Sequence, residues 1–521
     1  MIRRRACTLA VALAAVCAAQ AHASATQESM FQDDDQLVYA APDKAAATLD
    51  TLKKLGVDRV RISVFWKVVA PAADQQAKPA GFDGGDPAAY PVTAWDRYDT
   101  LVRLAQARGL GVSFDLTGPA PKWATGNPAR ADIDETYTPS GTEFEAFAHA
   151  VGTRYSGAYT PPAIAGTTPP PGPLPRVSYW EIWNEPNQAG WLTPQWLPDP
   201  RDAKQQIAVA PSVYRALADG AWSGLSATGH GADTILVGST APKGLNAQGE
   251  TRSIKPLAFI RGLYCLDDHL QFFRGEDAKV RDCPATNQAQ AFPAAHPELF
   301  KMTGWAHHPY ELTLAPDRRP TDPDYATIAN LDALSTTLRR VFQRYGQAQP
   351  AGGLPLYLTE FGYQTNPPDR TGVTPATQAA YLAQAEYLAW RNKHVRTLSQ
   401  FLLVDGGEPV GLTFQSGLRF HDGRAKPALT TYKLPFFLPV TKAKRGTAIT
   451  VWGLVRPATT AQEVQIQFRA RGAKSWRRIA TRRTSKKGYL NVRLKLPGNG
   501  TFRLRVGDLT SRAIAVTATV K

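Results

Sequence analysis

The chain has 521 residues, of which 43% are hydrophobic, together with 41 glycines and 41 prolines. This composition excludes a disordered or fibrous chain and allows one large globular domain plus a small one. The formal net charge is +16, but residues 440–521 hold nineteen Lys and Arg against two acidic residues, so the rest of the chain is nearly neutral.

The first 25 residues are typical of a secretory signal peptide. Three arginines at positions 3–5 precede an apolar run, and small residues at Ala23 and Ala25 offer cleavage sites. The apolar run is shorter than the roughly 20 residues that span a bilayer, which disfavours the alternative of a retained anchor. We therefore predict a secreted, extracellular or wall-associated protein without a membrane span.

From residue 36 onward, short apolar runs alternate with amphipathic segments. The predicted strands are residues 36–40, 57–64, 110–116, 177–183, 234–239, 302–306, 354–359 and 397–404. Helices are predicted between most of them, at residues 41–56, 95–109, 143–155, 213–225, 325–346 and 375–392. This rhythm predicts an α/β fold, a (β/α)8 TIM barrel over residues 26–435. An open doubly wound sheet is the alternative, but no Gly-rich phosphate loop follows an early strand.

Two cysteines remain after the predicted signal, Cys265 and Cys283. An even pair at short separation in an exported chain indicates a local disulfide, with two free thiols as the alternative. Neither cysteine has a second Cys or His at ligand spacing, so a zinc site is not expected.

The tail, residues 436–521, alternates apolar and polar residues in short runs at 448–455, 463–470, 489–496 and 501–506. This pattern predicts a small C-terminal antiparallel β-sandwich. Its basic charge has two interpretations: it binds an anionic cell-wall or capsule polymer, or it is the solvated face of an accessory domain. Nucleic acid is a poor partner for an exported chain.

Two glutamates carry the functional prediction: Glu185 in YWEIWNEPN and Glu360 in LYLTEFG. Each follows an apolar, aromatic-rich run, so both are expected at strand ends in one barrel mouth, where barrel enzymes keep their chemistry. Hydrolysis of a glycosidic bond needs one carboxyl to protonate the leaving oxygen and another to attack or activate water. Asn184, directly before Glu185, offers an amide to a sugar hydroxyl.

These motifs make the chain resemble the clan A glycoside hydrolases, retaining (β/α)8 enzymes with Asn-Glu-Pro at the fourth strand and a glutamate at the seventh. The resemblance covers residues 36–435. It implies that Glu185 is the acid/base and Glu360 the nucleophile, without cofactor or metal. WEIWNEPN and the PKWA segment around Trp123 look most like family 39, with family 5 close behind.

Other residues extend the resemblance. Arg61 in VRISVFW is expected at the end of the second strand beside the nucleophile, and a structural ion pair is its alternative. His308 and Tyr310 in HHPY resemble a pair that touches substrate and nucleophile, with the tyrosine hydroxyl donating to Glu360. His308 also allows a core position, which is the favoured one for His307.

Flat sugar faces bind aromatic faces, so Trp123, Trp183 and Trp191 are candidate substrate-binding residues, with a core position as the alternative. Trp180 is expected in the core. Many clan members place a tryptophan at the end of the eighth strand, whereas SQFLLVDGG offers Phe401, Asp405 and Glu408. The acidic run at residues 33–35 is expected to be a solvated turn, because it lacks the spacing of an EF-hand calcium loop.

Together these features predict a secreted retaining β-glycosidase that acts on a polysaccharide or oligosaccharide by double displacement. The alternative is a non-hydrolytic carbohydrate-binding or wall-associated protein on the same barrel. The missing eighth-strand tryptophan and the basic tail motivate that alternative.

Overall fold

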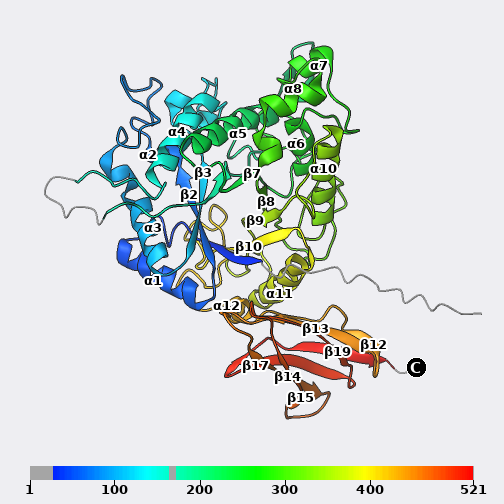
Figure 1. Ribbon diagram of the computed structural model, residues 1–521. Helices are drawn as coiled ribbons and strands as arrows, with labels where there is room; N and C mark the ends of the chain where they lie inside the picture. Colours follow the sequence, from blue (N-terminus) through cyan, green and yellow to red (C-terminus); the bar gives the residue numbers. More distant parts are fainter. Residues whose placement is uncertain (1–26, 164–171, 520–521) are drawn as a thin grey trace, which may run out of the picture.

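The computed structural model describes residues 27–163 and 172–519. It contains a barrel and, against one end of it, a smaller β-sandwich (Figure 1). The predicted signal peptide, residues 1–25, lies outside the described residues. None of the helices within the described ranges has the length and hydrophobicity that crossing a bilayer requires.

Eight parallel strands close into the barrel, and each pairs with the next until the last returns to the first. In barrel order they are β1 (Glu28–Gln32), β2 (Arg59–Phe65), β3 (Gly111–Thr117), β4 (Tyr179–Ile182), β7 (Thr234–Thr240), β8 (Gly304–His307), β9 (Leu356–Leu358) and β10 (Val395–Phe401). The predicted (β/α)8 barrel is confirmed.

Helices surround the barrel and bury their apolar faces against the strands. The longer ones are α1 (Pro42–Lys54), α3 (Asp96–Ala107), α4 (Gly141–Arg154), α5 (Ala210–Ala227), α6 (Pro256–Leu263), α8 (Gln288–Ala295), α10 (Leu331–Arg344), α11 (Pro375–Arg391) and α12 (Pro427–Lys433). Shorter turns are α2 (Trp66–Val69), η1 (Val92–Trp95), η2 (Lys122–Ala124), η3 (Ala131–Ile133), α7 (Gly275–Lys279) and α9 (Glu298–Lys301), and β5 (Trp196–Asp199) pairs with β6 (Asp202–Ala208). The helix predicted at 325–346 begins later, because the Asn330 side chain accepts the Thr327 N–H and closes a turn before α10.

The first predicted strand, residues 36–40, is wrong. The strand is β1, and the chain turns immediately after it because the Asp33 carboxylate accepts the backbone N–H groups of Gln36, Leu403 and Val404. The expected solvated turn is corrected at Asp33, which is only 1% exposed, whereas Asp35 is exposed. Burial raises the pKa of Asp33 to about 7, although these hydrogen bonds oppose the shift.

The tail folds as the predicted antiparallel sandwich, apart from one parallel pair, β12 with β19. One sheet has the order β11-β13-β16 and the other β12-β19-β17-β14-β15, with β18 beside β17. The strands are β11 (Phe436–Phe437), β12 (Lys442–Lys444), β13 (Ala448–Leu454), β14 (Glu463–Ala470), β15 (Arg477–Arg483), β16 (Tyr489–Lys495), β17 (Gly500–Val506), β18 (Leu509–Thr510) and β19 (Ile514–Thr519).

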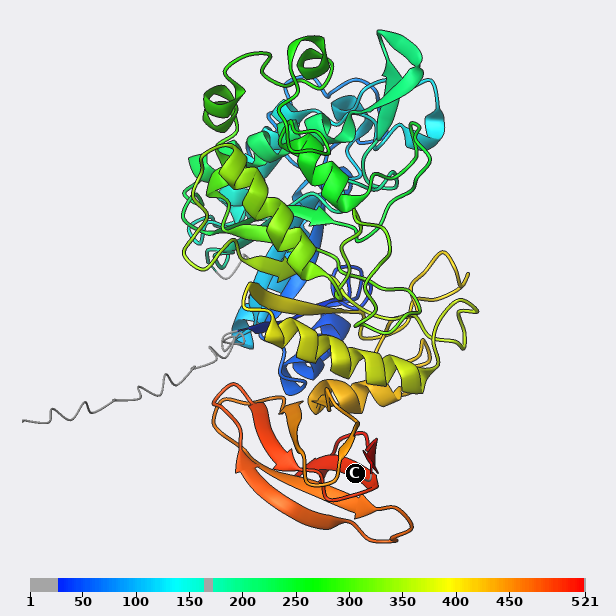
Figure 2. The same ribbon diagram turned by 90° about the vertical axis from the view of Figure 1, so that its right-hand side faces the viewer.

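The sandwich packs against α11 and α12 of the barrel (Figure 2). Arg456, just after β13, reaches the carboxylate of Glu386 on α11 at 2.7 Å, and both side chains are buried. Beside this ion pair, the Trp452 ring packs on Trp390 and Tyr387. A buried ion pair inside an aromatic cluster fixes the sandwich to the barrel rather than leaving it on a linker.

The predicted disulfide between Cys265 and Cys283 is present, with a sequence separation of 18 residues. We expect the double substitution Cys265→Ser, Cys283→Ser to lower the free energy of unfolding by about 3 kcal/mol, because the bridge restricts the unfolded chain. Urea denaturation of oxidised wild type beside the double variant measures the difference. Equal midpoints would show that the bridge does not stabilise the fold.

Candidate active site

A cleft of about 650 Å3 opens where the barrel strands end. Its floor carries Asn184, Glu185 and Glu360, and its walls come from the end of β2 and from loops that follow six other strands. The polar lining also includes Gln32, Asp34, Asp35, Ser63, Gln188, Lys243, Tyr310, Glu311 and Gln364. A cleft of this size at the carboxyl ends of barrel strands has the position and the volume of a ligand site.

Glu185 and Glu360 come together on the floor of this cleft. One carboxylate oxygen of each glutamate and one ring nitrogen of His308 all lie within 4.8 Å of one another. The backbone is unusual here: Trp183 and Glu185 have φ of 62° and 40°, so β4 ends in a sharp turn that aims Glu185 at the cleft. Left-handed conformations of side-chain-bearing residues cost energy and gather at functional sites.

Arg61 lies in the middle of β2, not at its end as predicted, and it is fully buried beneath the cleft. Its guanidinium donates to Glu360 at 2.7 Å, and the expected position beside that carboxylate is therefore confirmed. It also donates to the Asn184 side-chain oxygen at 2.9 Å, which leaves the Asn184 amide nitrogen to serve as a donor. Arg61 therefore orients two floor residues at once.

Two carboxyls that the sequence analysis did not identify, Asp115 and Glu181, complete the surroundings of Arg61. They accept from its guanidinium at 3.0 and 2.6 Å and are fully buried. Burial opposes ionisation, yet Arg61 and His308 lower the pKa of Glu181 to about 2. Burial dominates at Asp115 and raises its pKa well above the usual range. Arg61 itself stays charged, because these carboxylates outweigh its burial and raise its pKa.

His308 is buried between the two glutamates. Its Nδ1 lies 2.9 Å from Glu185 and 3.6 Å from Glu360, and its Nε2 lies 3.2 Å from the Ser239 hydroxyl. Burial would lower its pKa, but Glu360, Glu181 and Glu185 outweigh burial and raise the pKa to about 10. A protonated imidazole thus lies between the Glu185 and Glu360 side chains. Tyr310 donates its hydroxyl to Glu360 at 3.0 Å, as predicted.

The charge on His308 predicts a pH dependence of stability. Its folded pKa of about 10 exceeds its ordinary value of 6.5, so its contribution is complete below pH 6.5 and is lost as pH rises through about 10. We expect His308→Gln to cost most stability just below pH 6.5 and progressively less as pH rises toward about 10, measured by urea denaturation. His307→Gln is the matched control: burial lowers the His307 pKa to about 3, so it stays neutral throughout. A constant cost for His308→Gln would contradict the assignment.

The tryptophans divide between cleft and core. Trp191 lines the cleft, in agreement with a stacking role. Trp183 does not: it is fully buried, its ring packs edge-on against Phe144 at 5.3 Å, and its indole N–H donates to the Trp191 carbonyl. The positive φ of Trp183 turns its ring away from the cleft. Trp180 is in the core, as predicted.

Trp123 also lies outside the cleft lining, because its ring packs edge-on against Trp66 and Phe82. Its indole N–H donates to the Pro71 carbonyl. Trp123 therefore supports the loop that follows β3 and has no place in the described cleft wall.

At the end of the eighth strand, Phe401 lines the cleft where many clan members have a tryptophan. The other two residues predicted in this segment do not take that place. Asp405 is buried and pairs with Lys426 at 2.7 Å, and Glu408 is exposed. The acidic run after β1 contributes Asp34 and Asp35 to the lining. A correct position for the first strand would have placed these acids at a strand end and identified them as candidate site residues.

Two groups of described residues have the composition of metal ligands. One is Glu185, His308 and Glu360, where a protonated imidazole cannot serve as a ligand. The other is Asp219, His296 and Glu298, outside the barrel between α5 and α9. Burial and the neighbouring Asp219 raise the pKa of Glu298 to about 10, so this carboxyl is neutral beside the His296–Asp219 pair.

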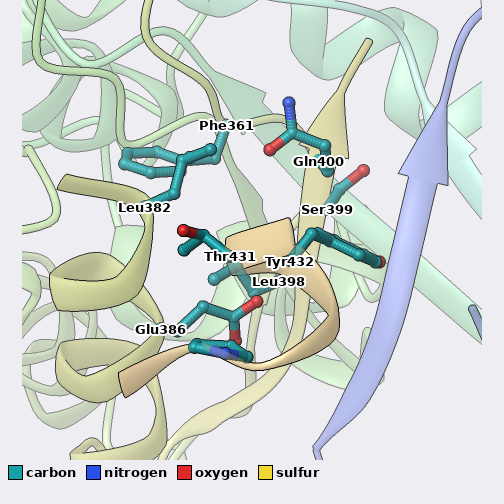
Figure 3. Close-up of a pocket in the computed structure, with 9 residues that line it drawn as sticks. Phe361, Leu382, Glu386, Leu398, Ser399, Gln400, Thr431 and Tyr432 are labelled. Atoms are coloured by element: carbon teal, nitrogen blue, oxygen red, sulfur yellow. The ribbon is translucent and has the colours of Figure 1, made fainter. Parts of the chain in front are cut away.

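A second cavity, between β10, α11 and α12, is lined by Ser399, Leu382, Glu386 and Tyr432 among others (Figure 3). Its volume is about 10 Å3, which is near the minimum for a single water molecule and far too small for a sugar. The cleft at the barrel mouth is therefore the candidate active site.

No family model matches the sequence, and no curated protein matches it either. Solved structures do resemble the fold. One is GH5_18 from Streptomyces cattleya in complex with GlcNAc, 16% identical, covering 78% of each chain with a TM-score of 0.42. Another is aphid myrosinase, 13% identical, covering 78% of this chain and 97% of that one with a TM-score of 0.46. A third is a glycoside hydrolase family 5 mannosidase from Rhizomucor miehei, 13% identical, covering 77% of this chain and 87% of that one with a TM-score of 0.37.

Proposed function

We propose that the protein is a retaining glycosidase that hydrolyses O-glycosidic bonds by double displacement. The observation that carries the proposal is the pair Glu185 and Glu360, with an oxygen of each within 4.8 Å at the floor of one cleft. Retaining glycosidases place their carboxyls about 5–5.5 Å apart, whereas inverting enzymes need roughly 6.5–9.5 Å to admit a water. The close approach of the two carboxyl groups here favours retention.

The contacts and exposure of the two glutamates indicate which is the nucleophile and which is the acid/base. Glu360 receives two hydrogen bonds, from Arg61 and Tyr310, which fix its orientation for attack on the anomeric carbon. Glu185 is the more exposed of the two, with a 19% exposed side chain, so it can exchange protons with the leaving group and then with water. It would first protonate the leaving oxygen and later deprotonate the attacking water.

Neighbouring groups would bind the sugar at the reacting centre. The Asn184 amide nitrogen can donate to a sugar hydroxyl, since Arg61 already occupies the Asn184 side-chain oxygen. Asp34, whose carboxyl group accepts from Gln32 and the Ser63 N–H, also lines the cleft and can accept from hydroxyls. Phe401 offers a ring in place of the usual tryptophan. The sequence resemblance to families 39 and 5 supports a β-linked polysaccharide or oligosaccharide as the substrate.

We further propose export and wall association. The N-terminal sequence and the disulfide support export, because such bonds persist in oxidising compartments. The sandwich carries the positive charge of the chain: β15 alone has four arginines, and Arg469 and Arg503 lie over the Trp476 ring at 4.9 and 4.2 Å. Such a surface would hold an anionic wall or capsule polymer, and salt would weaken the interaction.

Sugar release from xylans, glucans, mannans and bacterial exopolysaccharides by the purified protein tests the proposal. On an active substrate, NMR of the first product should show the anomer of the substrate before mutarotation. The opposite anomer would overturn retention. If the protein binds glycans but releases no sugar from any substrate of the panel, the non-hydrolytic carbohydrate-binding alternative is favoured.

A further inference from the structure

The rim of the cleft is apolar in a way that catalysis at Glu185 and Glu360 does not require. Leu312 and Leu412 line it with side chains that are 64% and 83% exposed, and Phe414 beside them is 53% exposed. Large hydrophobic residues with this exposure, gathered around one ligand cleft, mark a surface that is covered during function. We call Leu312, Leu412 and Phe414 the apolar rim.

The apolar rim is continuous with the reacting centre. The Phe414 ring packs edge-on against Phe401 at 5.3 Å, and Phe401 packs in turn against Tyr310 at 6.5 Å. Tyr310 donates to the proposed nucleophile Glu360. An unbroken row of aromatic rings therefore leads from the floor of the cleft to its exposed edge.

The loop after β10, which carries Leu412 and Phe414 of the rim, is held in place. At its base the buried Lys426 ammonium binds Asp405 at 2.7 Å, Thr365 at 2.8 Å and the Gln415 carbonyl at 3.0 Å. Higher up, the Phe414 carbonyl accepts the Gly406 N–H. A Cβ at Gly406 would lie 2.6 Å from the Thr413 side chain, so only glycine allows the two halves of the loop to approach this closely. The rim is thus presented by a supported loop, which lowers the entropic cost of binding.

Leucine side chains suit an alkyl chain and not further sugar units. They cannot hydrogen-bond hydroxyls, and their branched shape offers no flat face for stacking. The floor of the cleft is polar instead, because Asn184, Asp34 and the proposed catalytic carboxyls can hydrogen-bond sugar hydroxyls. We propose that the substrate is amphiphilic, a glycolipid or alkyl glycoside whose sugar binds at the floor while its hydrocarbon chain covers the apolar rim. This inference rests on the proposed glycosidase function and names its substrate class.

Binding of matched glycosides tests the inference without requiring turnover. Calorimetry would compare methyl with octyl thioglycosides of glucose, galactose, mannose and xylose, below their critical micelle concentrations, on the full-length protein. We expect at least one octyl derivative to bind more tightly than its methyl counterpart, by about tenfold for every two methylene groups buried. If every octyl derivative binds like its methyl counterpart, the proposal is wrong, whatever the outcome of the hydrolysis panel.

Substitutions in the rim test whether it is the source of the higher affinity for octyl glycosides. The double variant Leu412→Ser, Phe414→Ser should reduce the ratio of octyl to methyl affinity by about tenfold or more. Val440→Ser, at a 45% exposed valine between β11 and β12 of the sandwich, is the matched control and should keep the wild-type ratio. An equal reduction in the control would overturn the assignment. A second result would also overturn it: wild type binds phosphatidylcholine vesicles in the absence of any glycoside, and the double variant does not. The rim would then be a site that docks on membranes.

Discussion

The Glu360→Ala variant should lose hydrolysis of any substrate found in the panel, by at least about a thousandfold in kcat, since the covalent intermediate cannot form without the nucleophile. Steady-state rates of wild type and variant measure the loss. Glu463→Gln, an exposed carboxylate on β14 of the sandwich, is the control and should keep full activity. Preserved hydrolysis in Glu360→Ala would exclude the proposed mechanism.

The Glu185→Ala variant separates the two carboxylate roles. Loss of a general acid/base costs roughly 10²–10⁴ in rate, and least for substrates whose leaving group needs no proton. A small anion such as azide should enter the space vacated at Glu185 and restore turnover of such substrates with retained configuration. Azide should not restore Glu360→Ala in this way. Identical responses of the two variants would mean that the roles are assigned wrongly.

The meeting of Glu185 and Glu360 in one cleft could be predicted from the sequence, because strand ends can be read from apolar runs followed by Asn, Pro or Gly. Glu185 and Glu360 both follow such runs, and parallel strands in a barrel bring their ends to one mouth. Seven of the eight strands overlap their predicted positions. The first does not, because three backbone hydrogen bonds to Asp33 fold the apolar residues after β1 into a turn, and no local pattern records a bond to a loop some 370 positions away.

The buried network beneath the cleft could not be read in the same way. Asp115 and Glu181 sit inside predicted strands, where an acid among apolar residues is indistinguishable from a solvent-facing one until barrel closure defines the interior. Trp183 was misassigned for a related reason: strand alternation places its ring in the cleft, but β4 ends at Ile182 and the left-handed turn redirects it into the core. In both cases the sequence pattern did not reveal the direction in which the side chain points.

Arg61 makes this network testable through stability. Arg61→Met should lower the free energy of unfolding by about 3–5 kcal/mol, because it leaves Asp115, Glu181 and Glu360 near one another without their cation. Arg59→Met is the matched control on the same strand: Arg59 pairs with the partly exposed Glu28, so its loss should cost only about 1 kcal/mol. Urea denaturation of both variants measures the difference.

The cost of Arg61→Met should also depend on pH. Without the guanidinium, the folded-state pKa values of the buried carboxyls rise, so their ionised forms oppose folding and protonation favours it. The variant should therefore recover part of its stability as pH falls from neutral toward about 5, while Arg59→Met should show no such recovery. Equal costs for the two variants at every pH would show that Arg61 is an ordinary ion pair, and the orientation of Glu360 would then have to depend on Tyr310 and His308 alone.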